Sequence, residues 1–187
     1  MKNSLPLRYG QVAQFFHWST AVLVLAAFTL GPEGSELRVY SPAQNFDRQI
    51  HETLGLCVLG LLVLRLLWRL LDTRPVAPQL SPWMNIMAKA VQVAIYLLLF
   101  AVPASAIAGA WLEGHPLTLL AGIQIAPPVG LSHDLGATIA SVHTWLGDTI
   151  LWLAGFHAVA ALYHHFLLRD GVLVSMVPRW VPFLKQE

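Results

Sequence analysis

The chain has 187 residues, of which 56% are hydrophobic and 11% are charged, and its formal net charge at pH 7 is +1. Ordinary soluble domains carry about 25% charged residues. This composition, with a mean hydropathy of +0.61, therefore argues against a soluble domain and for a helical bundle in a membrane. The single cysteine, Cys57, excludes a disulfide within the chain.

The first apolar run covers residues 12–31 and contains His17 near its start. A transmembrane helix needs about 20 apolar residues, so this run is long enough to span. Lys2 and Arg8 precede it, as basic residues precede the core of a signal peptide, but no small-residue cleavage site of the usual kind follows. We therefore expect a retained first helix rather than a cleaved leader.

Two further spans are predicted at residues 50–71 and 87–112, and prolines punctuate the connection between them. The second span begins with His51, whereas the third contains no histidine. The next segment, residues 113–135, has two short apolar stretches broken by prolines and glycines, so it is too interrupted to span. We expect it to form a long loop on the outer surface.

The fourth span, residues 140–168, carries His143 and His157 fourteen residues apart. At about 1.5 Å per residue this spacing is a rise of about 21 Å. At about 100° per residue the two side chains point almost the same way. One helix can therefore present an imidazole near each face of the membrane.

The basic residues predict the orientation of the bundle. With four spans both ends of the chain share one side, and nine of the eleven Lys and Arg residues fall on it. Only Arg38 and Arg48 fall on the other side, together with seven of the ten acidic residues. Basic residues accumulate on the cytoplasmic side of membrane proteins, so both termini are expected in the cytoplasm.

Depth in the membrane then pairs the four histidines. His17 and His157 are both expected near the inner face, and His51 and His143 near the outer face. Each pair can supply two axial imidazoles to one haem iron. The alternatives are a hydrogen-bonding residue inside the bundle, an interfacial anchor, a proton relay or a zinc site. A relay is disfavoured because the spans offer no acidic residue at mid-depth, and zinc because its ligands would have to cluster.

Several motifs, in order and at matching spacing, resemble the bacterial cytochrome b561 family of small di-haem membrane cytochromes. They are Arg8-Tyr9-Gly10, Phe16-His17-Trp18, His51-Glu52-Thr53-Leu54-Gly55, Val63-Leu64-Arg65-Leu66-Leu67-Trp68-Arg69, Ala94-Ile95-Tyr96-Leu97-Leu98-Leu99, His143 through His157-Ala158, His164-His165-Phe166 and Met176-Val177-Pro178-Arg179. The fold expected is all-α: one domain over residues 1–187, a four-helix transmembrane bundle enclosing two b-type haems.

The resemblance implies electron transfer across the bacterial inner membrane between a one-electron partner and a quinone. One type of member is a superoxide oxidase, which passes electrons from periplasmic superoxide to ubiquinone. The acidic outer side departs from that pattern, because positive potential should steer anionic superoxide, although Arg38 and Arg48 could form a local basic entrance. The alternative is a haem-bearing electron-transfer subunit of a separate dehydrogenase or hydrogenase.

Secondary roles are predicted for several other polar side chains. Haem propionates need cationic partners, and Arg48 is the candidate at the outer haem, with Arg65 and Arg69 at the inner one. The alternative for each arginine is a side chain that snorkels to the interface. His164 and Arg74 are candidates for a quinone site near the inner haem. The alternatives for His164 are contact with a propionate of the inner haem or a cap at the end of the helix. His115 and His133, in the outer loop, are expected to face solvent.

Overall fold

The computed structural model describes residues 8–32, 34–72, 80–127, 132–178 and 181. Within these residues four helices are long and apolar enough to cross a membrane. They are α1 (Gln11–Thr29), α3 (Asn45–Leu71), α4 (Pro82–Glu113) and α5 (His133–Tyr163). Helix α5 continues into a π-helical turn, η3 (His164–Leu168). The prediction of an all-α chain with four such helices is confirmed.

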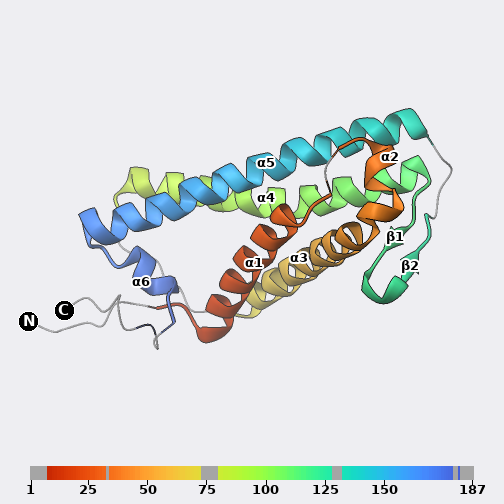
Figure 1. The fold of residues 1–187 in the computed structure, drawn as a ribbon. Helices are drawn as coiled ribbons and strands as arrows, with labels where there is room; N and C mark the ends of the chain where they lie inside the picture. Colours follow the sequence, from red (N-terminus) through yellow and green to blue (C-terminus); the bar gives the residue numbers. More distant parts are fainter. Residues whose placement is uncertain (1–7, 33, 73–79, 128–131, 179–180, 182–187) are drawn as a thin grey trace, which may run out of the picture.

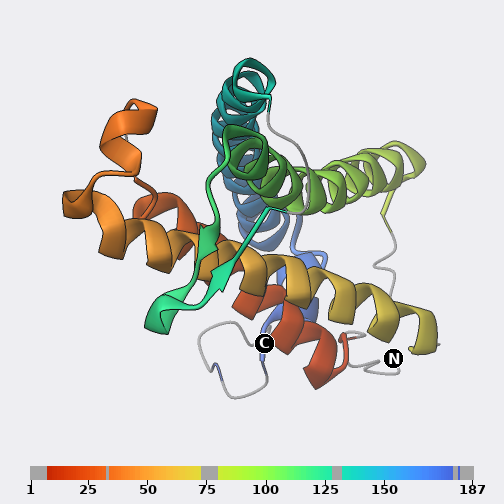
Figure 2. The ribbon, with the colours of Figure 1, turned by 90° about the vertical axis from the view of Figure 1, so that its right-hand side faces the viewer.

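The long helices pack as two pairs. Helices α4 and α5 lie along each other, α1 and α3 form a second pair, and the pairs cross with fewer contacts between them (Figures 1 and 2). The core between the pairs is small and contains Val58 and Leu62 of α3, Leu99 of α4 and Ile150 of α5. Large side chains such as Phe15 and Trp152 point outward and are 63% and 68% exposed, as expected for helices solvated by lipid.

Helices α4 and α5 approach closely because two glycines face each other across their interface. A Cβ atom on Gly136 would lie 2.7 Å from the Glu113 backbone nitrogen and 3.0 Å from the Gly109 carbonyl oxygen. A Cβ atom on Gly109 would lie 3.1 Å from the backbone nitrogen of Ala140. Small residues of this kind let membrane helices pack backbone to backbone.

One end of the molecule is built from short elements that follow α1 and α4 (Figure 1). Helix α2 (Glu36–Val39) and the 3₁₀ turn η1 (Pro42–Gln44) lead into α3. After α4, the strands β1 (Leu117–Thr118) and β2 (Gln124–Ile125) pair antiparallel around the turn η2 (Leu120–Gly122). We call this hairpin, α2 and the adjoining ends of α3, α4 and α5 the outer end.

The hairpin replaces part of the loop expected at residues 113–135. Strand β1 packs on α3, where the Glu52 carboxylate accepts a hydrogen bond from the Thr118 N–H and the Thr53 hydroxyl accepts one from the Leu120 N–H, 3.0 Å away. Helix α5 also begins at His133 instead of near residue 140. Asp134 lies in its first turn, where a carboxylate is favoured by the helix dipole, so the helix extends beyond its apolar part.

The opposite end is closed by α6 (Val172–Met176), which we call the inner end (Figure 1). The start of α1 is bound to it by side-chain donors: the indole of Trp18 donates to the Met176 carbonyl at 2.9 Å, and the amide of Gln14 donates to the Ser175 carbonyl at 3.2 Å. The backbone N–H of Tyr9 donates to the same Ser175 carbonyl. The described residues nearest the two chain ends therefore lie together, as an even number of spans requires.

Candidate functional site

Two histidine pairs form between the helix pairs, in the combinations that depth predicts. The ring centres of His51 on α3 and His143 on α5 are 5.9 Å apart, and the rings are inclined by 82°. The ring centres of His17 on α1 and His157 on α5 are 6.2 Å apart, with an inclination of 71°. Two imidazoles bound to opposite faces of one transition-metal ion, with bonds of about 2 Å, have ring centres roughly 6 to 6.5 Å apart.

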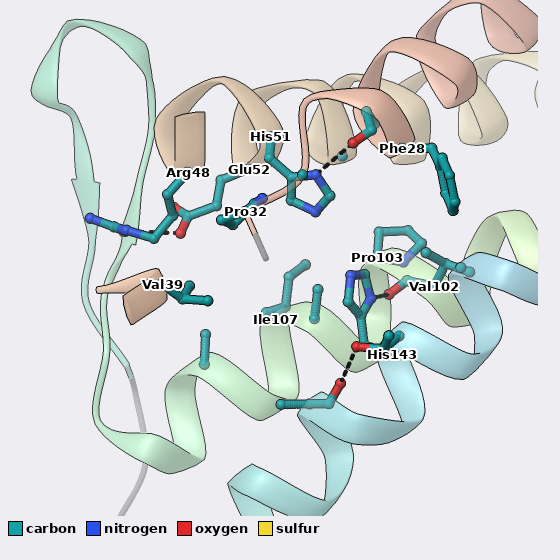
Figure 3. Close-up of a pocket in the computed structure, with 18 of the residues that line it drawn as sticks. Phe28, Pro32, Val39, Arg48, His51, Glu52, Val102, Pro103, Ile107 and His143 are labelled. Carbon is teal, nitrogen blue, oxygen red and sulfur yellow. Dashed lines mark hydrogen bonds and ion pairs between the residues drawn. The ribbon is translucent and has the colours of Figure 1, made fainter. Parts of the chain in front are cut away.

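Backbone carbonyls fix the orientation of the outer pair. Nδ1 of His51 lies 2.8 Å from the carbonyl oxygen of Ala27, and Nδ1 of His143 lies 2.9 Å from that of Val102 (Figure 3). A carbonyl oxygen only accepts, so both rings carry their proton on Nδ1, and Nε2 keeps a free lone pair. A second hydrogen bond of this kind is the usual way in which proteins orient a ligating imidazole.

Helix α4 therefore contributes to the outer pair although it provides no histidine. Pro103 follows Val102 in α4 and has no N–H, so the helix lacks the hydrogen bond from position 103 to the Leu99 carbonyl. The Val102 carbonyl accepts hydrogen bonds from Nδ1 of His143 and from the Ser105 hydroxyl. Sequence reasoning missed this role, because the partner is a backbone carbonyl and no residue type marks it.

The outer pair opens into a cavity of about 790 Å³ between the helix pairs (Figure 3). Its walls are mostly apolar and include Phe28, Pro103 and Ile107, with a few polar groups at the rim. Gly31 gives the His51 ring its space, because a Cβ atom there would lie 3.2 Å from Nδ1. A Cβ atom on Gly55 or Gly147, which also line the cavity, would meet none of the described atoms within 4 Å.

Arg48 lies at the rim of this cavity, within reach of an anionic ligand. Its guanidinium forms an ion pair with Glu52 at 2.9 Å, donates to the Asn45 side chain at 2.8 Å, and lies 5.1 Å from the ring centre of Tyr40. Its Nε is buried and has no hydrogen-bond partner among the described residues. One donor is therefore available to a haem propionate, while the pairing with Glu52 weakens the basic entrance expected from Arg38 and Arg48.

The inner pair has a different polar environment. Arg65 lies on α3, close enough to His17 and His157 to act on both electrostatically, and its guanidinium is 5.3 Å from the ring centre of Tyr96. Arg69 is exposed in the last turn of α3. His164 follows α5, and its Nδ1 is bonded to the carboxylate of Asp170. Arg74 lies outside the described residues.

Of the two loop histidines that were expected to face solvent, only His133 is exposed. His115 is half-buried, stacks on Tyr40 with ring centres 3.4 Å apart, and contacts the Glu36 carboxylate at 2.8 Å. His133 is exposed but also lies 3.0 Å from Glu36. The expectation failed for His115 because it depended on where α2 folds, which the local sequence does not indicate.

The residues present fit b-type haem. Free Nε2 atoms in the outer pair, suitable ring separations in both pairs, glycines facing open space and an available arginine donor are the features that a bis-histidine haem site requires.

Comparison with known proteins also indicates a b-type cytochrome. The family model described as prokaryotic cytochrome b561 matches residues 8–179. The chain is 32% identical to cytochrome b561 homolog 2 of Escherichia coli strain K12 over 179 residues, which cover 94% of each protein. It is 31% identical to the probable superoxide oxidase CybB of Yersinia pestis, over 92% of this chain and 97% of that protein.

Proposed function

Because the chain belongs to the prokaryotic cytochrome b561 family, we propose that it binds two b-type haems and carries electrons across the bacterial inner membrane to or from ubiquinone. Family membership implies b-type haem and membrane electron transfer. The number of haems, the donor and the quinone are our proposals. The observation that carries them is the presence of two separate imidazole pairs, one toward each end of α5.

Each bound haem supplies a one-electron redox couple. The chain's own residues bind and orient the group: His51 and His143 offer Nε2 while Ala27 and Val102 hold their Nδ1 protons. Apolar side chains around the cavity exclude water. The low local dielectric that results strengthens electrostatic interactions with a bound haem. Arg48 offsets negative charge at the rim.

For the donor we propose a small one-electron reductant on the periplasmic side, with superoxide the first candidate because a relative carries the name probable superoxide oxidase. The test uses proteoliposomes that contain the purified protein and ubiquinone, with superoxide generated outside. We expect ubiquinol formation that requires the protein and is abolished by His143→Ala. Reduced haem without ubiquinol formation would contradict the proposed acceptor.

A second candidate is an electron-transfer subunit of a dehydrogenase or hydrogenase. The acidic outer end favours it, because Glu36 and Glu113 line the cavity and would repel an anion, whereas Arg48 is paired with Glu52. Failure of superoxide to reduce the haems, together with rapid reduction by a dehydrogenase that co-purifies from native membranes, would select this function over the first.

We place the quinone site at the inner end beside His164. The Asp170 carboxylate holds the Nδ1 proton of His164, which leaves the Nε2 lone pair to accept a hydrogen bond from a quinol hydroxyl, and Arg74 remains a second candidate. We expect His164→Ala to lower quinone turnover at least tenfold while both haems are retained and still reduced from outside. Unchanged turnover, or a quinone bound beside His51 and His143, would contradict this placement.

A further inference from the structure

A second group of metal-ligating side chains lies at the outer end, apart from the two histidine pairs. It contains Glu36 of α2, Glu113 at the end of α4, His115 just beyond it, and His133 at the start of α5. Nε2 of His115 is 2.8 Å from the Glu36 carboxylate, and Nε2 of His133 is 3.0 Å from it. One ligand atom from each of Glu36, Glu113 and His115 lies within 4.8 Å of the other two. We call these four residues the rim cluster.

Local structure holds the rim cluster in place. Helix α4 ends at Gly114 in the left-handed conformation, with φ 90°, and the N–H of His115 donates to the Ala110 carbonyl at 2.8 Å. This turn brings His115 back over the helix end. The ring then stacks on Tyr40, inclined by 17°. All four ligands therefore lie at or directly next to the end of a helix.

The backbone also makes room for the fourth ligand, Glu113. A Cβ atom at position 136 would lie 2.7 Å from Cγ of Glu113, so only glycine there accommodates this side chain without a shift. Glu113 and Glu36 both line the mouth of the outer cavity. Two carboxylates are thus concentrated on one small area, and the hydrogen bond from His115 holds the pKa of Glu36 below its ordinary value.

Two imidazoles and two carboxylates form a donor set that suits zinc and similar first-row divalent ions. Imidazole is a poor ligand for calcium or magnesium, which prefer oxygen. Ligand atoms around a tetrahedral zinc ion with bonds of about 2.0 to 2.1 Å are about 3.3 Å apart. The separations of 2.8 and 3.0 Å in the rim cluster need only small adjustments to reach that value.

We propose that Glu36, Glu113, His115 and His133 bind one divalent cation of the zinc class at the rim of the outer cavity. The bound ion links α2 to the facing ends of α4 and α5. Its two positive charges also neutralise the two carboxylates at the mouth of the cavity, where an anionic reductant would have to enter. Cation binding itself needs neither haem ligand pair, so it stands independently of the proposed electron transfer.

The test is zinc binding by the purified haem-containing protein in detergent. The protein is stripped with EDTA, dialysed against ZnCl₂ at known free concentrations, and analysed for zinc per chain by atomic emission. We expect saturation at one zinc per chain, with at least tenfold weaker binding in Glu36→Gln, His115→Ala and His133→Ala. Asp134→Asn is the matched control, because it removes an acidic charge at the same end without removing a ligand, and it should bind as wild type does.

Haem spectra of every variant establish that the bundle is intact, and His133→Ala is the safest variant because its exposed side chain can be removed without disturbing packing. X-ray absorption at the zinc edge should show mixed nitrogen and oxygen ligation with imidazole scattering, and zinc should raise the unfolding temperature of wild type but not of His133→Ala. Absence of stoichiometric binding, or equal affinity in wild type and all three variants, would overturn the proposal and leave a hydrogen-bonded ion-pair cluster. Neither result depends on quinone turnover, so the proposed function is judged separately.

Discussion

A histidine ligates a metal ion only through a nitrogen that carries no proton, so the partner of the other ring nitrogen decides what the residue can do. For His51 and His143 that partner is a main-chain carbonyl, which cannot be lost by substitution of a side chain. The orientation of these imidazoles is thus fixed by the helix backbones, and the side chains at Ala27 and Val102 matter only through the path of the chain.

The histidine pairs predict shared phenotypes for single substitutions. We expect His51→Ala and His143→Ala each to reduce the haem content from two per chain to one, with identical residual spectra. His17→Ala and His157→Ala should lose the other haem and share a different residual spectrum. Haem is counted by the pyridine haemochrome assay and the spectra are compared in dithionite. A common spectrum for His17→Ala and His143→Ala would contradict the pairing.

Gly31 predicts a selective effect on the outer pair. A side chain at this position meets the His51 ring at 3.2 Å, so Gly31→Val should rotate or push away the imidazole. Disturbing the support of a metal ligand typically weakens metal binding by about 10- to 100-fold. We expect outer haem to be lost on dilution at least tenfold faster, measured by Soret absorbance, with the inner haem unaffected. Gly60→Ala is the control, since a Cβ atom there meets no described atom within 4 Å.

At the scale of elements, α5 is the scaffold on which the site is built, because it supplies one histidine to each pair and packs most closely on α4. That packing depends on Gly136, where an added Cβ atom would overlap the backbone nitrogen of Glu113. Overpacking a tight contact costs about 1–3 kcal/mol. We expect Gly136→Ala to lower the free energy of unfolding by about this amount, measured by denaturant unfolding in mild detergent, whereas Gly60→Ala should leave it nearly unchanged.

The elements also show where sequence reasoning succeeds. The four long helices could be predicted because a membrane span needs about 20 apolar residues, and few other structures contain apolar runs of that length. The meeting of His17 with His157 and of His51 with His143 follows from the direction of each span. Their roles as haem ligands remain predictions.

The outer end could not be predicted in the same way. The hairpin at Leu117–Thr118 and Gln124–Ile125 is held by Glu52 and Thr53 of α3, which are distant in sequence. The stacking of His115 on Tyr40 and its contact with Glu36 likewise depend on the path of short connections. Hydrophobic periodicity carries no information about such contacts, because they are few, polar and non-local.

For the whole molecule, charge and shape give one consistent orientation. The start of α1, the end of α3, the start of α4 and the end of η3 lie toward α6 (Figure 1). The described basic residues at these helix ends are Arg8, Arg65, Arg69, Lys89 and Arg169, whereas Arg38 lies on α2 and Arg48 near the start of α3. The positive-inside rule then predicts that α6 lies on the cytoplasmic side and the hairpin on the periplasmic side. This arrangement puts the His51–His143 pair nearer the periplasm and His164 nearer the cytoplasm, so the direction of electron flow that we propose depends on it.

The orientation can be tested with single cysteines, since Cys57 is the only native one. In a Cys57→Ser background, Asp134→Cys at the start of α5 should react with a membrane-impermeant maleimide in spheroplasts. Ser81→Cys, the N-cap of α4 at the opposite end, should react only after the membrane is opened. Both positions are exposed, so a difference between them reports sidedness rather than burial. Labelling of Ser81→Cys but not of Asp134→Cys in spheroplasts would show the opposite orientation in the membrane. The rim cluster and its cation would then face the cytoplasm.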